Sequence, residues 1–359
     1  MSAVTELRRR TLFAAPLAAL ARGLRAQEPK LRLGYDTYSL RAWGMKALDH
    51  LEFAARHGCT ALQISSLGDF ESLEAAHLQK VRARAEELGI MLDAGTGCIC
   101  PSARAWRNRA ETPEEHLRRA LRVAKAVGAR TLRCYLGDFE DRLHPNGIEF
   151  HMENTVRVFR AVRETALETG VKIAIENHSG DLQAWECRQI IEAAGTDAVG
   201  ACLDTGNPIW CAEHPEVTLE VLGPVAVTTH VRDTAIFPHA RGCAAHWTAL
   251  GDGSVDMAKL ASLQKRLCPD APLHLEIITG RPPRIVPFFE PEFWKAFPKA
   301  RAGEFARFVA LVKSGSPLMK PMVIEDVPGM DVAEYRAALK KQQQLDLERS
   351  LAYARERMI

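Results

Sequence analysis

The segment Val171-Lys-Ile-Ala-Ile-Glu176 is a short apolar run that ends on a carboxylate, and the same pattern returns further along the chain. The later copies are Val199-Gly-Ala-Cys-Leu-Asp204, Val225-Ala-Val-Thr-Thr-His230 and Pro272-Leu-His-Leu-Glu276. Apolar runs of this length, separated by helix-like stretches, predict buried strands of a parallel sheet. Each of these strands would end on a residue that can bind a metal ion.

The same alternation of strand and helix extends over most of the chain. Earlier strands are expected at residues 31–35, 61–64, 90–94 and 130–135. Helices are expected at residues 45–56, before Gly89, and at 112–128, 150–168, 182–194, 217–222, 255–267 and 303–313. Eight alternating units predict an α/β fold, the (β/α)₈ TIM barrel. An open doubly wound sheet is the alternative, but no Gly-rich phosphate loop follows the first strand.

A barrel of this kind gathers the carboxyl ends of its strands at one mouth, where active sites lie. Glu176, Asp204, His230 and Glu276 would therefore converge there. Each could instead be an ordinary polar group of the barrel interior. A shared metal site is the better interpretation, because four such residues end consecutive strands and unpaired buried acids are costly. Oxygen-rich ligation with one histidine suits Mn²⁺ or Mg²⁺ better than structural zinc, which prefers Cys and His.

A cation bound at this mouth would favour chemistry at a carbonyl group. It would polarise the carbonyl of a keto-sugar and stabilise an enediolate beside it. Glu176 and Glu276 lie on strands separated by two others, so their carboxylates could flank a substrate and transfer a proton at carbon. Side chains two positions apart share a face of a strand, which extends the site beyond the ligands. The expected substrate-binding residues are His178, Asn207, Arg232 and Trp247.

Composition limits the function classes. Hydrophobic residues make up 47% of the chain and charged residues 26%, which is ordinary for a globular protein with a sizeable core. The net charge of +2 gives no reason to expect a nucleic-acid partner. The nine cysteines form no CxxC pair, and Cys98-Ile-Cys100 is too tightly spaced for a zinc knuckle. We expect them to be small buried apolar residues.

The two ends of the chain differ from the repeat. The basic stretch Leu7-Arg-Arg-Arg-Thr-Leu-Phe13 and the apolar residues 14–21 predict a twin-arginine export signal over residues 1–27, and hence a periplasmic protein. A frayed helix in a cytoplasmic enzyme is the alternative. The apolar run is too short to span a membrane. The barrel would then occupy residues 28–315.

Residues 316–359 predict a C-terminal helical extension. Its apolar positions Leu347, Leu351, Ala354 and Met358 recur at helical spacing, so this face would dock on the barrel or on a second copy of the chain.

Three loops invite an interpretation. The stretch 281–294 contains Phe288, Phe289, Phe293 and Trp294, which would form either a lid or sugar-stacking wall, or a loop packed on the barrel rim. Residues 234–246 are expected to be a long loop. Gly251-Asp-Gly253 would shape the turn before a helix that Asp256 caps.

Five motifs resemble one known superfamily. They are Ile175-Glu-Asn-His178, Leu203-Asp-Thr-Gly-Asn207, Thr229-His-Val-Arg-Asp233, Trp247-Thr-Ala-Leu-Gly-Asp-Gly-Ser-Val-Asp256 and Leu275-Glu276. Over roughly residues 31–313 the chain resembles the sugar phosphate isomerase/epimerase superfamily, the xylose isomerase-like barrels that include the ketose 3-epimerases. The resemblance implies one divalent metal, with Mn²⁺ favoured and Mg²⁺, Co²⁺ or Zn²⁺ as alternatives. Its implied ligands are Glu176, Asp204, His230 and Glu276, with Glu176 and Glu276 also as the acid/base pair.

The resemblance implies an isomerase or epimerase acting on a small carbohydrate, a ketose or keto-sugar. Two positions depart from the ketose 3-epimerases. Asn207 stands where they have a histidine, and Arg232 lies closer to the metal histidine than their arginine does. A 3-keto-glycoside lyase or hydrolase, acting by β-elimination at the same site, is therefore an alternative. A metal nuclease of the apurinic endonuclease type and a non-catalytic sugar-binding barrel are further alternatives.

Overall fold

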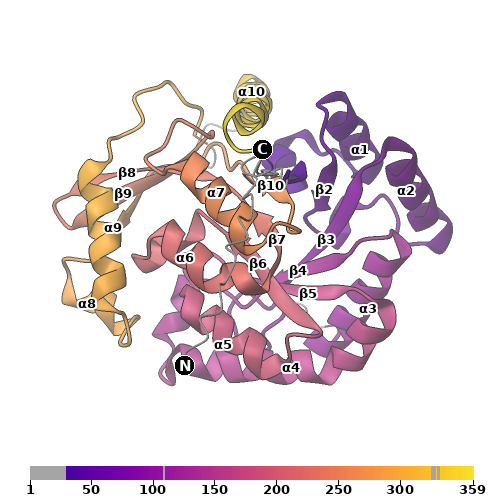
Figure 1. The fold of residues 1–359 in the computed structure, drawn as a ribbon, viewed down its shortest axis with the longest axis horizontal. Coiled ribbons are helices and arrows are strands. Elements are labelled where there is room, and N and C mark those ends of the chain that lie inside the picture. Colours follow the sequence, from indigo (N-terminus) through magenta and orange to yellow (C-terminus); the bar gives the residue numbers. More distant parts are fainter. Residues whose placement is uncertain (1–29, 108–109, 325–328, 330–331) are drawn as a thin grey trace, which may run out of the picture.

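A computed structural model of the chain describes residues 30–107, 110–324, 329 and 332–359. The expected export signal, residues 1–27, lies outside the described residues, so export stays a prediction. The described part forms a barrel of strands surrounded by helices, with a second, smaller sheet at one side (Figure 1).

Eight parallel strands form the barrel, in the order β10-β1-β2-β3-β4-β5-β6-β7. They are β1 (Leu33–Asp36), β2 (Ala61–Ile64), β3 (Met91–Cys98), β4 (Thr131–Tyr135), β5 (Lys172–Glu176), β6 (Val199–Asp204), β7 (Ala226–His230) and β10 (Leu273–Leu275). The barrel closes where the Val231 N–H donates to the His274 carbonyl at 2.8 Å and the Glu276 N–H donates to the Val231 carbonyl at 3.1 Å. The predicted TIM barrel is confirmed.

Helices follow the strands on the outside of the barrel. They are α1 (Ala47–Arg56), α2 (Ala75–Leu88), α3 (Pro113–Ala126), α4 (Gly147–Thr169), α5 (Ala184–Ala194), α6 (Pro215–Leu222) and α7 (Met257–Leu267). The cap positions follow the sequence. The Glu115 N–H donates to Thr112 Oγ1 at 3.2 Å, and the Lys259 N–H donates to Asp256 Oδ1 at 3.0 Å, as expected for Asp256.

Short 3₁₀ helices lie in the connections between these elements. They are η1 (Thr37–Trp43), η2 (Leu67–Asp69), η3 (Phe139–Leu143), η4 (Asn207–Cys211) and η5 (Gly223–Val225). Three of them, η1, η2 and η4, begin just beyond the carboxyl ends of barrel strands, so they surround the mouth at which the candidate site lies.

A three-stranded antiparallel sheet follows β7, where the sequence predicted a long loop. It consists of β8 (Asp233–His239), β9 (Gly242–Thr248) and β11 (Arg284–Val286), in the order β11-β9-β8. The loop expectation for residues 234–246 was therefore wrong, because the hairpin starts directly after β7 and its small residues give little apolar pattern. We call β8, β9 and β11 the added sheet.

The turn after β9 is held by one buried carboxylate. Asp233 accepts the N–H groups of Gly251 and Gly253, both at 3.0 Å. Gly251 has a φ of +84°, and a Cβ on Gly253 would lie only 2.1 Å from Asp233 Oδ1. Both glycines are required, in agreement with the prediction that this stretch shapes a turn.

The last two helices do not lie where the alternating pattern predicts them. The helix α9 (Ala302–Ser314), expected to complete the eighth unit, lies on β8 of the added sheet. The helix α10 (Ala333–Arg357) lies instead against η1, β1 and β10 (Figure 1). The spaced residues Leu347, Leu351, Ala354 and Met358 are all buried. The tail thus docks on the barrel of its own chain, and a homo-oligomer through this helix stays a prediction.

The aromatic stretch after β10 packs on the rim. It includes β11 and the short helix α8 (Pro291–Lys295). Phe288 and Trp294 meet Phe305 of α9 at ring distances of 5.3 and 4.8 Å, and Trp294 Nε1 donates to the Phe288 carbonyl at 2.8 Å. The packed-loop interpretation therefore describes Phe288, Phe293 and Trp294, while Phe289 is exposed.

The expectation for the cysteines agrees with the structure. All nine cysteines are buried and unpaired. Among the described helices, none is long and apolar enough to cross a membrane.

The docking of α10 predicts an asymmetric response to two leucine substitutions. Leu351 is fully buried in the structure, whereas Leu345 of the same helix is 46% exposed. Leu351→Ala should lower the free energy of unfolding by about 2–5 kcal/mol, because it leaves a cavity under the buried face of α10. Leu345→Ala should change it by less than about 0.5 kcal/mol. Urea denaturation followed by circular dichroism measures both, and equal effects would contradict the docking.

Candidate active site

Four side chains meet at the mouth of the barrel. Glu176, Asp204 and His230 end β5, β6 and β7, and Glu276 follows β10 directly. One potential ligand atom from each lies within 4.8 Å of the others, and all four side chains are buried. The structure therefore brings together the residues predicted from the strand ends.

A carboxylate that the sequence analysis missed lies beside the other ring nitrogen of His230. Its Nδ1 lies 3.4 Å from Glu176 Oε1 and 3.2 Å from Glu276 Oε2. Its Nε2 lies 3.4 Å from Oδ2 of Asp36, the last residue of β1. A carboxylate at Nε2 favours the tautomer with its proton on that nitrogen, which leaves the Nδ1 lone pair for a metal ion.

Backbone and amide groups hold Asp204 in place. Its Oδ1 accepts the N–H groups of Gly206 at 2.7 Å and Asn207 at 2.6 Å. Asn177 binds both the N–H and the carbonyl of Asp204, at 2.9 and 3.0 Å. Oδ2 is the Asp204 oxygen nearest to His230, at 3.9 Å from Nδ1. The side-chain amide of Asn207 donates to Glu176 Oε1 at 3.1 Å, so Asn207 is placed beside a candidate ligand.

Two arginines bind the candidate ligands. Arg133, from β4, forms an ion pair with Glu176 and donates to the Thr96 carbonyl at 3.2 Å. Arg232 forms ion pairs with Asp204 and Glu276, and its Nη2 lies 3.8 Å from Glu176 Oε1. Arg133 was not predicted, whereas Arg232 was predicted only as a substrate contact.

The charges of this cluster fit a divalent cation. The carboxylates are Asp36, Glu176, Asp204 and Glu276, and the guanidinium groups that face them are those of Arg133 and Arg232. The cluster therefore carries two more acidic than basic groups. Hard cations such as Mg²⁺ and Mn²⁺ prefer carboxylate oxygens, and such an ion would balance the difference.

The pKa shifts follow from burial and from these charges. Burial raises the pKa of Asp204 to about 6, although Arg232 opposes it. Burial also acts against ionisation of the two glutamates, but ion pairing outweighs it. Arg133 and His230 hold the pKa of Glu176 well below its usual range, and Arg232 and His230 lower that of Glu276 to about 2. Both glutamates are therefore ionised at neutral pH and can accept a proton.

The pKa of His230 is raised by the negative charge of the same cluster. Burial opposes its protonation, yet Cys202, Glu276 and Glu176 raise the pKa of His230 well above its usual range. A cation among these carboxylates would remove that effect.

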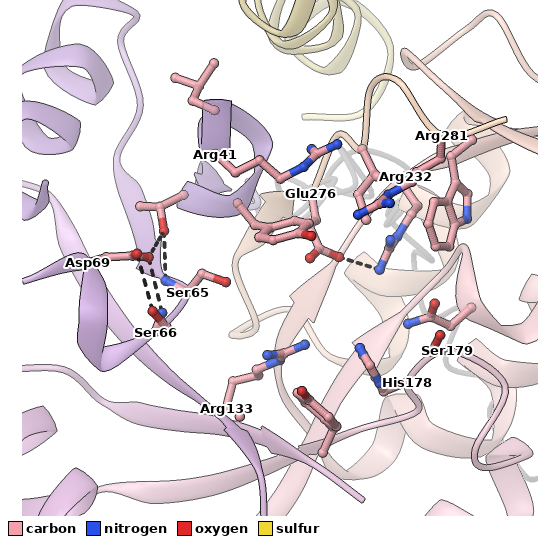
Figure 2. A pocket seen from close by; sticks show the side chains of 18 of the residues that line it. Arg41, Ser65, Ser66, Asp69, Arg133, His178, Ser179, Arg232, Glu276 and Arg281 are labelled. Atoms are coloured by element: carbon pink, nitrogen blue, oxygen red, sulfur yellow. Dashed lines mark hydrogen bonds and ion pairs between the residues drawn. The ribbon is translucent and has the colours of Figure 1, made fainter. Parts of the chain in front are cut away.

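A cavity of about 800 Å³ opens above the cluster. This volume is in the range of pockets that bind small molecules. The predicted residues His178, Asn207, Arg232 and Trp247 all line it, together with Glu276. Figure 2 shows Glu276 bound to Arg232, with Arg133 and His178 on the same side of the cavity. The structure therefore places all predicted site residues in one site, and their roles in binding and catalysis stay predictions.

One wall of the cavity is a column of stacked rings and guanidinium groups. Arg232 lies over Trp247 at 4.5 Å, and Trp247 meets Trp210 edge-on at 5.2 Å. Arg284 of β11 lies over Trp210 at 4.7 Å. The aromatic wall thus consists of Trp210 from η4 and Trp247 from β9 rather than the phenylalanines of 281–294.

His178 lies flat against a second aromatic ring. It stacks on Tyr135 at 3.9 Å, and its Nδ1 lies 2.8 Å from the Gly137 carbonyl. A carbonyl accepts only, so Nδ1 carries the proton and Nε2 can accept a hydrogen bond from a substrate hydroxyl. Burial lowers the pKa of His178, which favours this neutral form.

The missed residues come from the first half of the barrel. Asp36 and Tyr135 end β1 and β4, and Arg133 lies two residues before Tyr135 on the same face. The strand-end rule that identified the ligands would have found Asp36 and Tyr135 if applied to every strand, whereas Arg133 lies in the middle of β4. Trp210 carries no such signal, because it belongs to a 3₁₀ helix beyond the strand.

Comparisons with known proteins agree with this fold. A relative, the 3-oxo-isoapionate decarboxylase of Pectobacterium atrosepticum, is 26% identical over 185 residues, or 52% of this chain, and the chain spans 60% of that relative's length. A structure of D-psicose 3-epimerase in the presence of D-fructose matches with a TM-score of 0.56 at 14% identity, over 91% of this chain and 99% of that chain.

A xylose isomerase-like TIM barrel protein from Mycobacterium smegmatis, solved in complex with magnesium, has a TM-score of 0.52 at 13% identity. The matched region covers 79% of this chain and 97% of the Mycobacterium smegmatis protein. At these identities the likeness to the solved structures is one of fold. The family model described as xylose isomerase-like TIM barrel matches residues 51–292, more than half of the sequence. The chain therefore belongs to the xylose isomerase-like TIM barrel family.

Proposed function

We propose that the protein is a divalent-metal-dependent enzyme that moves a proton at a carbon next to the carbonyl group of a keto-sugar, as an isomerase or epimerase does. The observation that carries this proposal is the set of four ligand-type side chains within 4.8 Å of one another, beside a cavity of about 800 Å³. An enzyme family and an enzyme-named relative support catalysis. The likeness to D-psicose 3-epimerase supports a ketose as substrate.

The residues that would hold the metal are Glu176, Asp204, His230 and Glu276. Three carboxylates and one imidazole favour Mn²⁺ or Mg²⁺, and the magnesium complex of a structural relative supports a divalent ion. When bound, such an ion acts as a Lewis acid that polarises the substrate carbonyl.

The proton transfer falls to Glu176 and Glu276. They come from β5 and from the end of β10, with β6 and β7 between them, so they approach a substrate from different sides. Their low pKa values keep both as carboxylates. One carboxylate removes the proton from carbon to give the enediolate. Return of a proton from the opposite side inverts that carbon, whereas its return to the neighbouring carbon exchanges aldose and ketose.

Decarboxylation is a second candidate, favoured by the relative named 3-oxo-isoapionate decarboxylase. A 3-oxo acid loses CO₂ when the bond to its carboxylate breaks and the electron pair enters the ketone as an enolate. A proton taken up from solvent then adds to that carbon, relayed by one of the carboxylates of the site. The intermediate is of the same kind, so the site could serve either reaction. β-Elimination from a 3-keto-glycoside would also begin with the same proton removal, but it would release the neighbouring leaving group.

Replacing either proposed proton-transfer residue should stop exchange at carbon. Glu176→Gln and Glu276→Gln remove the base but keep its size, so solvent deuterium incorporation should fall by at least about 100-fold. The assay is NMR in D₂O with Mn²⁺ on a panel of ketoses, 3-keto-glycosides and 3-oxo sugar acids, which also identifies the product. Glu290→Gln, on the rim outside the cavity, is the matched control. Exchange that persists in both active-site variants would refute the mechanism.

The protein should bind one divalent ion per chain, and the bound ion should stabilise the fold. After removal of metal with EDTA, Mn²⁺ at about 100 times its dissociation constant should raise the free energy of unfolding by about 2.7 kcal/mol. Asp204→Asn should lose most of this gain, whereas Asp197→Asn, an exposed acid paired with Arg163, should keep it. Calorimetric titration and thermal unfolding measure both. A stoichiometry of three ions would favour a nuclease, and no binding would refute the metal site.

A further inference from the structure

Glu276 lies just beyond the point where the regular pairing of its strand ends. The register of β1 with β10 ends at the pair Tyr35 and Leu275, so Glu276 is one residue past the last paired position. On the side of β7, its own N–H donates to the Val231 carbonyl at 3.1 Å. On the side of β1, the backbone around Glu276 depends on contacts other than the ladder between the two strands.

A buried serine supplies the contact on the side of β1. Ser39 belongs to η1, the 3₁₀ helix that follows β1, and it is fully buried. Its hydroxyl donates to the Leu275 carbonyl at 3.1 Å and accepts the Ile277 N–H at 2.9 Å. One hydroxyl therefore binds the backbone on both sides of Glu276. Because this backbone carries the carboxylate, the place of Glu276 among the candidate ligands depends on Ser39.

The helix α10 holds η1 in turn. The Ala42 N–H donates to Gln343 Oε1, and Trp43 Nε1 donates to the Lys340 carbonyl, both at 3.0 Å. Gln343 is fully buried, and a buried amide is costly unless it is hydrogen-bonded. The end of η1 is thereby fixed to α10, four residues or fewer from Ser39.

A second contact of α10 reaches the segment that follows Glu276. Thr279 Oγ1 donates to Asp346 Oδ2 at 2.8 Å. Gln343 and Asp346 are three residues apart on α10, so they lie on the same face of the helix. This face of α10 therefore holds both the 3₁₀ helix that carries Ser39 and the segment that follows Glu276.

These contacts come from the two ends of the described chain. The family model matches residues 51–292, whereas η1 covers residues 37–43 and α10 covers residues 333–357. The strand that carries Glu276 lies within the matched region, but the groups that hold its backbone on the side of β1 lie outside that region.

We propose that Ser39 is a positioning residue for Glu276, and that Gln343 and Asp346 of α10 keep Ser39 and the segment after Glu276 in place. This inference rests on the proposed function, in which Glu276 is a metal ligand and a proton-transfer residue. Groups behind the ligands of a metal ion fix their orientation, and loss of one such group typically costs about 10- to 100-fold in metal affinity or activity.

Removal of the Ser39 hydroxyl tests this role directly. In Ser39→Ala, the Ile277 amide loses its acceptor and should exchange with solvent about tenfold faster, as measured by mass spectrometry of peptides that contain it. The affinity for Mn²⁺, measured by calorimetric titration, should fall about tenfold. At saturating Mn²⁺, kcat for deuterium incorporation into substrate should fall by a similar factor while KM changes little, because the base is displaced and the substrate contacts remain.

Variants of α10 test the path from the helix to the site. Gln343→Met removes the acceptor for the Ala42 N–H at similar size, and it should lower Mn²⁺ affinity less than Ser39→Ala does. Because Gln343 acts through Ser39, the double variant should bind Mn²⁺ as weakly as Ser39→Ala alone. Asp346→Ala should also weaken Mn²⁺ binding. Asp346→Asn, which keeps an oxygen for the Thr279 hydroxyl, should restore it.

Ser350 provides the matched control in the same helix. It is fully buried, and its hydroxyl accepts the Leu250 N–H at 3.0 Å in the turn after β9. Ser350→Ala should lower the thermal unfolding temperature about as much as Gln343→Met does, yet leave the Ile277 amide and Mn²⁺ affinity unchanged. A loss of Mn²⁺ affinity as large as that of Ser39→Ala would show a general effect of stability and overturn the inference.

Two results for Ser39→Ala would also overturn the inference. One is an unchanged exchange rate of the Ile277 amide, because Ser39 would then not hold this segment. The other is faster amide exchange with Mn²⁺ affinity and kcat at the wild-type level, because the site would then not need the contact.

The amide measurement separates this inference from the proposed function. If the wild type neither binds Mn²⁺ nor incorporates deuterium into substrate, the proposed function fails, and the Ile277 amide in Ser39→Ala and Ser350→Ala alone decides whether Ser39 holds Glu276. If the wild type does both and Ser39→Ala changes none of the three readouts, the function stands and the inference fails.

Discussion

The repulsion among the buried carboxylates at the barrel mouth is the constraint on which the rest of the site depends. Glu176, Asp204 and Glu276 point at one another in a place from which water is largely excluded, where like charges interact strongly. Such a cluster persists only if cations stand among it. Arg133 and Arg232 partly fulfil this need, and Asp36 adds a further acid behind His230. The carboxylates at the barrel mouth therefore favour a bound cation. A divalent ion would balance their negative charge better than the guanidinium groups alone.

The cavity is built from the barrel strands together with the added sheet. The family framework supplies the four strand ends, whereas β9 and β11 supply Trp247 and Arg284. The same wall carries Trp210, which joins the two contributions through ring contacts. The base of the cavity and this wall are therefore built by different parts of the chain.

Local patterns predicted the barrel well, because each strand is an apolar run bounded by turn residues and each helix carries its own end signals. The strands 61–64 and 199–204 have the predicted limits, and Glu176, Asp204, His230 and Glu276 meet as their strand ends require. The predictions that failed concern segments with a weak local pattern or contacts between distant parts of the chain. The β8–β9 hairpin contains Ala235, Ala244 and Ala245 where a strong strand pattern would have larger residues. No local signal says that α10 rather than α9 covers β10, or that Arg133 reaches across to Glu176.

The place of α10 has a consequence for the order in which the molecule is completed. The helix covers the seam where β10 meets β1, so the first strand of the described residues is covered by the last helix among them, which is 25 residues long. Contacts between such distant segments form late, since they close almost the entire chain into one loop. The seam therefore stays uncovered until residues 333–357 have been synthesised. A chain that stops short of Leu347 would expose the apolar outer side of this seam to solvent.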